Sequence, residues 1–307
     1  MPESTKTQTI NTPESRLTSS LSASHHPALV VPQVSTLRLG LVAATELFAL
    51  RSPCTTRSPL RYPGGKSRGV NSILEYIPAG ISHLLSPFLG GGWIELALGA
   101  QRGVVVHGYD LYEPVTTFWR CLQSDAARLA DEAARFYPLP KKRFYELQRT
   151  FEDFRQFPFS YAARFFVLNR SSYSGTTLSG GMSAPEHTRF TLSAIARLRE
   201  FWNPHLKVGH LCFTESLLRH PDLFVYADPP YLVDSALYGT KGSTHRNFDH
   251  LALRDLLGSR HGWVLSYNDC PEIRKLYNGY RILTPQWSYS MTKDKASREL
   301  LILGPGA

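Results

Sequence analysis

The sequence predicts an α/β fold, and the order of elements in its first half indicates this class. An apolar run at 81–85 leads into a glycine-rich turn at 86–92, and a helical pattern follows at 93–101. A β-branched run at 103–110 comes next and ends in an acid, Asp110. This succession predicts a Rossmann-like sheet with helices on both faces, in which ligands bind across the carboxyl ends of the strands.

The remaining elements continue the alternation. Aromatic residues at helical spacing indicate that 112–168 is mostly helical and that its aromatic side chains belong to the core. A loop rich in Gly, Ser and Thr is expected at 169–190. Further strands are predicted at 223–231, 262–269 and 299–304, with a helix at 250–258.

Residues 1–57 differ from the rest in composition. They are dense in Ser, Thr and Pro, so we expect a disordered or loosely attached extension, with one short helix at 38–50. The chain has neither the pattern of a secretory signal nor an apolar run long enough for a membrane span. Its four cysteines are scattered, which argues against a structural zinc site and against disulfides. We therefore expect a soluble, intracellular protein of a reducing compartment such as the cytoplasm.

The formal net charge of the 307 residues is +9. The extension carries five basic and three acidic residues, so most of this surplus belongs to the folded part. A basic balance of this size favours an anionic partner, with nucleic acid first. A merely well-solvated surface is the alternative that charge alone leaves open.

The stretch 60–68 contains Gly-Gly-Lys-Ser, which resembles the end of a phosphate-binding loop of an ATPase. That loop requires a first glycine five residues before Gly65, but Leu60 stands there. The preceding residues are polar and broken by proline, whereas the loop of an ATPase follows a buried strand. The ATPase hypothesis is therefore weak, although triphosphate binding that depends on Lys66 would restore it.

The glycine turn after the first strand predicts a nucleoside-sized cofactor. Gly90, Gly91 and Gly92 are contiguous, and the third spaced glycine of a dinucleotide fingerprint is replaced by Glu95. A mononucleoside is thus more plausible than NAD. The carboxylate of Asp110 suits a ribose because it can accept hydrogen bonds from both hydroxyls, although ordinary turn chemistry after a strand is the alternative.

The sequence Asp-Pro-Pro-Tyr at 228–231 directly follows an apolar run, so it lies at the carboxyl end of a strand. An aspartate carboxylate and a backbone carbonyl, here Asp228 and Pro229, can accept both hydrogens of an exocyclic amine and localise its lone pair for attack. Pro229 and Pro230 hold the turn rigid, and Tyr231 offers a face on which a base can stack. A rigid turn without chemistry is the alternative.

These motifs together resemble the Dam-like family of S-adenosylmethionine-dependent DNA adenine N6-methyltransferases, particularly its phage and prophage members. The resemblance runs from about Ser58 to Leu303, and the motifs occur in the family's order. The stretch RYPGGKS resembles the family's amino-terminal cofactor motif and PFLGGGWIEL its cofactor turn. DPPY resembles the catalytic motif and SYND a later motif at the end of a strand.

The resemblance implies S-adenosylmethionine as cofactor, with Tyr62 and Lys66 against the methyl donor. It also implies that the cofactor is bound by further residues: Pro87, Phe88, Gly90 and Gly92 of the glycine turn, Asp110 and Asp228. Lys66 then contacts the cofactor rather than a phosphate. Two features depart from the family: Trp93 replaces a small residue, and the acid that contacts the donor's adenine is unclear, Glu215 being the nearest candidate.

The resemblance also implies an inserted, mainly helical target-recognition region at 136–205, between a cofactor-binding part at 58–135 and a catalytic part at 206–307. Arg170 and Tyr173 are the expected DNA contacts there, and Lys295 is a further candidate for phosphate. The partner is double-stranded DNA, and we expect a monomer without metal. The stretch 169–190 lacks the arginine-tyrosine-asparagine run of GATC-reading members, so GATC is not assigned.

The expected reaction is direct methyl transfer to N6 of an adenine flipped out of the duplex. Asn/Asp-Pro-Pro-Tyr/Phe motifs also serve methyltransferases that act on RNA bases or on protein amides, and the basic charge suits RNA equally well. A non-catalytic DNA-binding module is a further alternative. It would show salt-sensitive binding without uptake of the donor.

Overall fold

We analysed a computed structural model that describes residues 54–62, 64–184, 188–232, 248–285 and 299–307. The chain divides into two units, Met1–Arg51 and Ser52–Ala307, and all described residues belong to the second. The predictions for the extension at 1–57 and for Lys295 fall wholly or largely outside the described residues.

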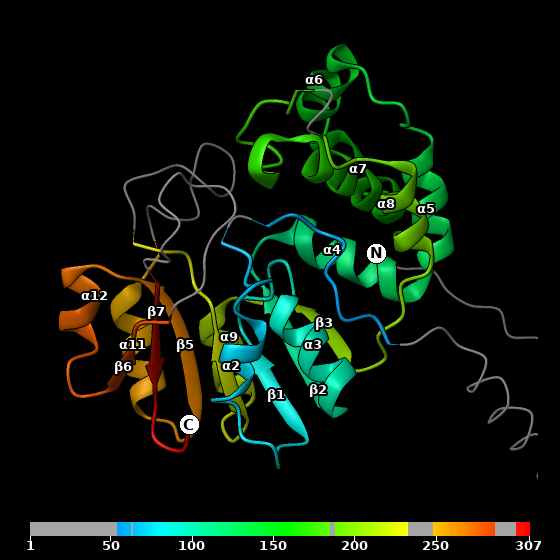
Figure 1. The fold of residues 1–307 in the computed structure, drawn as a ribbon. Coiled ribbons are helices and arrows are strands. Elements are labelled where there is room, and N and C mark those ends of the chain that lie inside the picture. The colour runs from blue at the N-terminus through cyan, green and yellow to red at the C-terminus, as the bar shows by residue number, and fades with distance from the viewer. Residues whose placement is uncertain (1–53, 63, 185–187, 233–247, 286–298) are drawn as a thin grey trace, which may run out of the picture. The chain divides into compact units, whose positions relative to one another are not determined.

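A seven-stranded sheet forms the centre of the second unit, in the order β3-β2-β1-β4-β5-β7-β6 (Figure 1). The strands are β1 (His83–Ser86), β2 (Val105–Asp110), β3 (Leu206–His210), β4 (Phe224–Ala227), β5 (Trp263–Asn268), β6 (Arg281–Leu283) and β7 (Glu299–Leu303). The first five are parallel, whereas β7 runs antiparallel to both of its neighbours. The first residue of β7 therefore lies at the same edge as the carboxyl ends of β1 to β5.

Helices surround this sheet. They are α2 (Val70–Leu74), α3 (Trp93–Arg102), α4 (Glu113–Ser124), α5 (Ala126–Ala134), α6 (Lys141–Arg149), α7 (Pro158–Ser171), α8 (Leu192–Arg199), α9 (Phe213–Arg219), α11 (His250–Gly258) and α12 (Pro271–Leu276), with short 3₁₀ turns η1 (Glu152–Phe154) and η2 (Tyr173–Gly175). In the part of the chain that the structure describes, none of the helices is long and apolar enough to cross a membrane.

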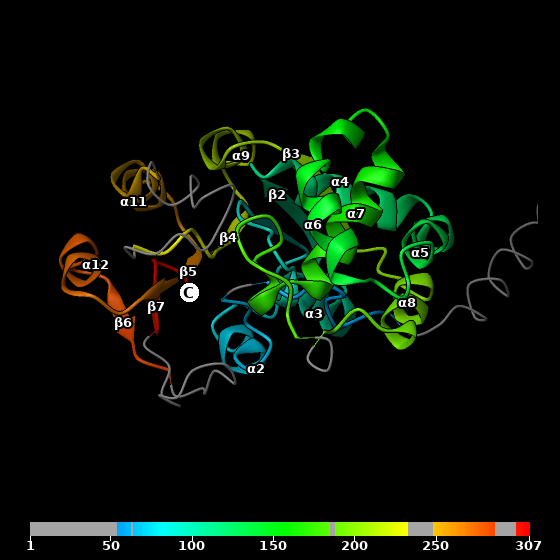
Figure 2. The same ribbon diagram turned by 90° about the horizontal axis from the view of Figure 1, so that it is seen from above.

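Alternation along the strands divides the core between the two faces of the sheet. Leu84, Tyr226 and Val264 pack into one apolar cluster with the helices α2 to α8. Their neighbours Leu85 and Val225 belong to a second cluster with α9, α11 and α12. Successive side chains of a strand point to opposite faces, and a sheet covered on both faces has apolar residues in both sets. Figure 2 shows α9 and α11 on one side of the sheet and α2 and α3 on the other, as the sequence predicts.

The connection from β2 to β3 contains α4 to α8, so the predicted helical insertion is present. Its centre is α7, which begins with Pro158 at a position where a missing N–H costs nothing, and which is buried along most of its length. The helices α4, α5, α6 and α8 pack around it or around one another. The boundaries of the target-recognition region at 136–205 remain a prediction.

Five short elements were not predicted from the sequence: α2, β3, α9, α12 and β6. The strand β3 lies at one edge of the sheet and contains Lys207, Gly209 and His210, so it lacks an apolar run. The predicted loop at 169–190 was placed slightly too early, because residues 169–171 complete the last turn of α7 and Asn169 is fully buried.

Candidate active site

The chain changes direction across the sheet between β1 and β4. These two strands are neighbours, and their successors lie on opposite sides of the pair, β2 and β3 beyond β1, β5 beyond β4. A crevice forms at the carboxyl ends of such a pair because the connections leave in opposite directions. A cavity of about 340 Å³ lies there, lined by residues that follow β1, β2, β3 and β4 and by Tyr62, Gly64, Gly65 and Lys66.

The glycine turn after β1 forms one wall of this cavity. Gly90 (φ +45°) and Gly92 (φ +66°) are in the left-handed region, which side chains disfavour. A Cβ atom on Gly91 would lie 2.8 Å from Cβ of Tyr62, and one on Gly90 would lie 3.0 Å from the Tyr62 ring. Gly90 also accepts a hydrogen bond from Nε1 of Trp119 at 3.0 Å. The glycines therefore allow Tyr62 to lie directly on the turn.

Asp110 closes β2 and ties it to the glycine turn. Its Oδ2 accepts the backbone N–H of Gly90 at 2.8 Å, and its Oδ1 accepts that of Tyr112 at 2.9 Å. Burial raises the pKa of Asp110, while these backbone hydrogen bonds act in the opposite direction. Each carboxylate oxygen keeps a second lone pair. The side chain lines the cavity and can accept hydroxyl groups there.

Residues 61–66 are held in place by a buried amide of α7. Asn169 accepts the backbone N–H of Arg61 at 2.8 Å and donates to the carbonyl of the same residue at 2.7 Å. This two-way clamp sets where Tyr62 and Lys66 enter the cavity. Residues 54–62 form no strand, unlike the residues before the loop of an ATPase. The ammonium of Lys66 binds a carboxylate of the protein. Both observations argue against the ATPase hypothesis.

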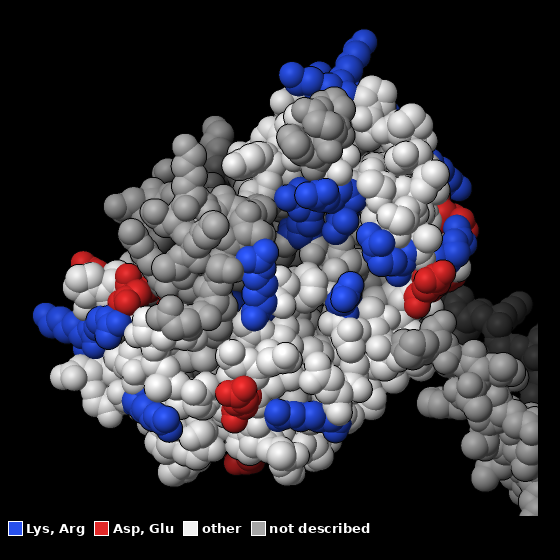
Figure 3. Space-filling model, in the orientation of Figure 1, with Lys and Arg blue, Asp and Glu red and all other residues white. Residues whose placement is uncertain are grey.

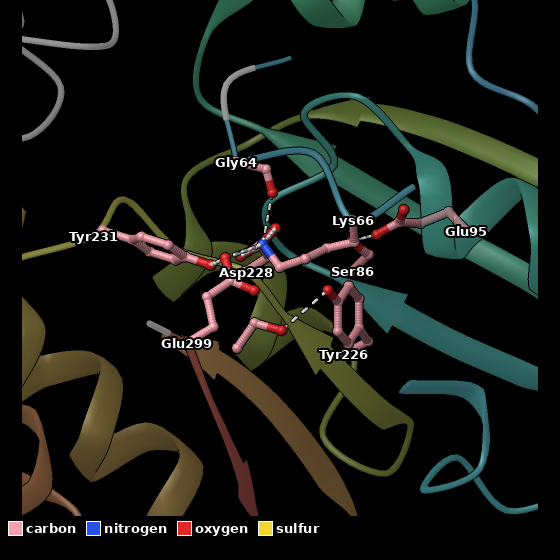
Figure 4. Close-up of polar contacts among 9 residues, drawn as sticks. Gly64, Lys66, Ser86, Glu95, Tyr226, Asp228, Tyr231 and Glu299 are labelled. Carbon is pink, nitrogen blue, oxygen red and sulfur yellow. Dashed lines mark hydrogen bonds and ion pairs between the residues drawn. The ribbon is translucent and has the colours of Figure 1, made fainter. Parts of the chain in front are cut away.

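Lys66 is 3% exposed, and its ammonium lies at the centre of a polar network (Figure 4). It donates to both carboxylate oxygens of Asp228, at 2.8 and 2.7 Å, to the carbonyl of Gly64 at 2.8 Å and to the hydroxyl of Tyr231 at 2.8 Å. The Tyr231 hydroxyl donates in turn to Glu299, whose Oε1 lies 3.5 Å from the Lys66 ammonium. The Lys66 ammonium thus lies between two carboxylates, of which Asp228 lines the cavity.

Burial shapes the protonation of this network. It raises the pKa of Asp228 to about 6, although the Lys66 charge acts against it. For Lys66 burial acts to lower the pKa, but Asp228 and Glu299 outweigh it and the net pKa is raised. Nearby, burial raises the pKa of Glu95 to about 7, and its Oε1 accepts the hydroxyl of Ser86 at 2.7 Å. Lys66 is therefore charged at neutral pH, and Asp228 is mostly ionised.

The structure brings most of the predicted site residues together. Those that line the one cavity are Tyr62, Lys66, Pro87, Phe88, Gly90, Gly92, Asp110, Asp228, Pro229, Pro230 and Tyr231. Their individual roles stay predictions. Trp93, which departs from the family pattern, also lines the cavity, and a Cβ atom on Gly65 would lie 3.3 Å from its ring. Glu215 is not a lining residue, because its carboxylate caps the start of α9 by accepting the backbone N–H of Cys212.

The two described DNA-contact candidates lie outside the cavity lining. Arg170 is half-buried, and its guanidinium donates to the carbonyls of Arg189 at 2.9 Å and Pro59 at 3.2 Å. Burial first, and then the charges of Arg61, Arg197 and Arg189, lower the pKa of Arg170 to about 10. Tyr173, in η2, is 70% exposed. Arg170 therefore lies near three other arginines, and Tyr173 is exposed to solvent.

Several lining residues were missed in the sequence. The rings of Phe213 and Phe248 pack on Phe88, with centroids 5.8 and 5.6 Å away, and all three line the cavity. Phe213 follows β3, a strand too short and polar to predict, and so its place was not visible. Glu299 was missed as well, because an acid before an apolar strand looks like an ordinary exposed end.

Comparison with known proteins agrees with this site. Residues 62–291 match the family model for the D12 class N6 adenine-specific DNA methyltransferases. The chain is also 25% identical over 245 residues to the Type II methyltransferase M1.LlaDCHI of Lactococcus lactis subsp. cremoris, a match that covers 72% of this chain and 84% of that protein. The family match spans well over half of the chain and includes both walls of the cavity. The chain belongs to the D12 class of N6 adenine-specific DNA methyltransferases.

Proposed function

We propose that this protein transfers the methyl group of S-adenosylmethionine to N6 of an adenine that has been flipped out of double-stranded DNA. The observation that carries the proposal is the position of Asp228. Asp228 directly follows β4, at the crevice between β1 and β4, and lines the cavity. Its carboxylate forms an ion pair with Lys66. DNA adenine methylation is the activity of the family, and the cofactor and the details of base binding are the proposal.

The cavity suits the proposed cofactor. Its polar wall offers the Asp110 carboxylate for ribose hydroxyls, and its apolar wall, with Phe88, Phe213 and Leu111, offers surface for an adenine ring. Tyr62, which packs on the glycine turn, also lines the cavity. When bound, S-adenosylmethionine supplies a methyl group made electrophilic by its sulfonium. The protein's task is to place an amine in line with it.

Asp228 is the group that holds the amine. Its carboxylate and the Pro229 carbonyl can accept both amino hydrogens, which withdraws the nitrogen lone pair from the ring and directs it outward. The nitrogen must lose one proton as it gains the methyl group, and a carboxylate with a pKa near 6 can accept that proton at neutral pH. Because both oxygens of Asp228 are now bound by Lys66, the lysine must release at least one of them when the amine enters.

Base flipping is required because the cavity cannot reach an adenine stacked inside a duplex. Extruding a base costs a few kcal/mol, and two features of the chain can offset that cost. Tyr231 lines the cavity next to Asp228 and offers a stacking face. Outside the cavity, Arg170 with the arginines around it and the exposed Tyr173 can contact the backbone and the bases that remain.

The proposal is tested by incubating the full chain with methyl-labelled S-adenosylmethionine and unmethylated genomic DNA, followed by nucleoside analysis. We expect label in N6-methyladenine, at one short sequence when modified positions are mapped. The Asp228→Ala protein is the control and should bind the cofactor without transferring label. Label that enters RNA or protein but not DNA would contradict the proposal, and so would label in another base.

A further inference from the structure

Glu299 is a buried acid at the beginning of an otherwise apolar strand. It is 3% exposed and thus as buried as the four residues that follow it in β7, but those four are apolar. It reaches the site because β7 is antiparallel to β5, which pairs Glu299 with Asn268 at the carboxyl end of β5. Burying a carboxylate is costly unless it is paired. The residue lies beyond the region matched by the family model, which ends at 291.

Two of the groups that Glu299 contacts belong to the proposed active site. The hydroxyl of Tyr231 donates to Oε1, and the same oxygen is 3.5 Å from the ammonium of Lys66. This separation allows a strong charge interaction but exceeds an ordinary N–H···O hydrogen bond. In the structure the three protons of the ammonium go to Gly64, Asp228 and Tyr231. Glu299 is therefore the second, longer-range carboxylate of the lysine.

This arrangement has a consequence for the reaction proposed above. The amine of the base and the ammonium of Lys66 compete for the oxygens of Asp228, which the lysine binds at 2.8 and 2.7 Å. A buried ammonium that loses a carboxylate must find another acceptor, because an unpaired charge in the interior is strongly destabilising. Glu299 is the adjacent carboxylate, and a small rotation of the lysine side chain would bring the two within hydrogen-bond distance.

We infer that Glu299 is a positioning residue that accepts the Lys66 ammonium when the substrate amine takes Asp228. This inference rests on the proposed function. Glu299 touches neither cofactor nor base; it acts through Lys66, and through Tyr231, whose hydroxyl it holds. In the substrate-free protein Lys66 binds Asp228, and in the complex it moves toward Glu299 while Asp228 binds the amine.

The decisive variant is Glu299→Gln, which keeps an oxygen acceptor for Tyr231 and removes only the charge. We expect S-adenosylmethionine and DNA to bind within about two-fold of the wild type. The single-turnover rate of methyl transfer should fall by roughly 10- to 100-fold, the size usual for groups that hold a directly acting residue. Glu299→Asp keeps the charge and should recover part of the rate. Glu272→Gln, an exposed acid in α12, is the matched control and should change nothing.

The pH profile separates positioning from a general structural role. The negative charge of Glu299 contributes to the raised pKa of Asp228, so its removal should move the acidic limb of the rate to lower pH. An equal loss in the Gln and Asp variants with an unmoved limb would show a structural role and overturn the inference. A wild-type rate in Glu299→Gln would also overturn it while leaving the proposed function intact. A wild-type protein that transfers no methyl group would refute both.

Discussion

The segment at 61–66 supplies one basic side chain to each of two very different charged regions. At its end, Lys66 is buried and binds carboxylates, so its charge is balanced within the protein. At its start, Arg61 belongs to a group with Arg170, Arg189 and Arg197 whose mutual repulsion helps lower the pKa of Arg170. Figure 3 shows Lys and Arg side chains gathered in the middle of one face, with few acidic side chains near them.

The difference indicates what each region is for. A buried charge balanced inside the protein sets geometry and protonation, as a catalytic group requires. A group of arginines that repel one another raises the potential of a surface and favours an anion such as a phosphate backbone. The same short segment thus joins the proposed catalytic site to the proposed DNA-binding surface. Substitutions at four positions test whether the two regions differ in this way.

The largest effect, on the free energy of unfolding, is expected from removing the buried ammonium of Lys66. Lys66→Met leaves Asp228 and Glu299 without their shared partner, and breaking a buried pair costs about 3–5 kcal/mol. Urea unfolding at pH 7.5 should show this loss. Without Lys66 the pKa of Asp228 rises above its wild-type value of about 6, so the loss should shrink as pH falls toward 6, where the carboxyl of the variant is already protonated. Lys142→Met, an exposed lysine in α6, should lie within about 0.5 kcal/mol of the wild type. Equal stability of the two variants would show that the buried network is not a paired one.

A second test concerns Glu95, the buried acid beside the network. Its folded pKa of about 7 lies above its ordinary value of 4.5, so the folded protein holds a proton that the unfolded chain has lost between these two values. Stability from this group is therefore lost as pH rises from about 4.5 to 7, by on the order of 3 kcal/mol. Glu95→Gln cannot ionise and should be more stable than the wild type at pH 8, with the gain disappearing near pH 4.5. A gain that does not depend on pH would contradict the raised pKa.

The smallest effect is expected on the arginine surface. Arg189 and Arg197 are exposed, and replacing either by Gln should weaken DNA binding by about 1 kcal/mol and lower the slope of log affinity against log salt by about one. Cofactor binding should not change. Arg199→Gln is the matched control in the same helix, because Arg199 already pairs with Asp131. If the Arg189, Arg197 and Arg199 variants weaken DNA binding equally, the arginines around Arg170 contribute no more to DNA binding than a paired surface arginine does.

Local motifs predicted much of the site. Four predicted residues lie at or just after the carboxyl end of a strand: Gly90, Gly92, Asp110 and Asp228. Because the carboxyl ends of parallel strands meet at one edge of a sheet, their convergence could be expected from the sequence. The seven-stranded order and the antiparallel β7 could not, because register and strand direction depend on long-range pairing. The glycine turn at 90–92 was predicted to contact the cofactor, which stays a prediction; the structure shows in addition that Gly90 and Gly91 make room for Tyr62.

The contacts across the chain were the part that sequence could not show. Lys66 was predicted against the cofactor, and that contact stays a prediction; what the sequence did not show is that its ammonium binds Asp228, 162 residues away. Asn169 was assigned to a loop, yet it clamps Arg61 from the end of α7. Glu299 looked like an ordinary start of a strand. Each of these roles follows from how distant segments pack, and no spacing within a segment carries that information.

We propose that the ionised carboxylate of Asp228 holds the amine during transfer. The most direct test of this role is the single-turnover rate of methyl transfer to DNA from pH 5 to 8, for the wild type and for Asp228→Asn. The wild-type rate should rise about ten-fold per pH unit below 6 and level off above it, since the pKa of Asp228 is about 6. The Asn variant should bind S-adenosylmethionine normally and be slower by about 10³-fold, without this step. A flat wild-type profile, or an Asn variant within ten-fold of the wild type, would contradict the claim.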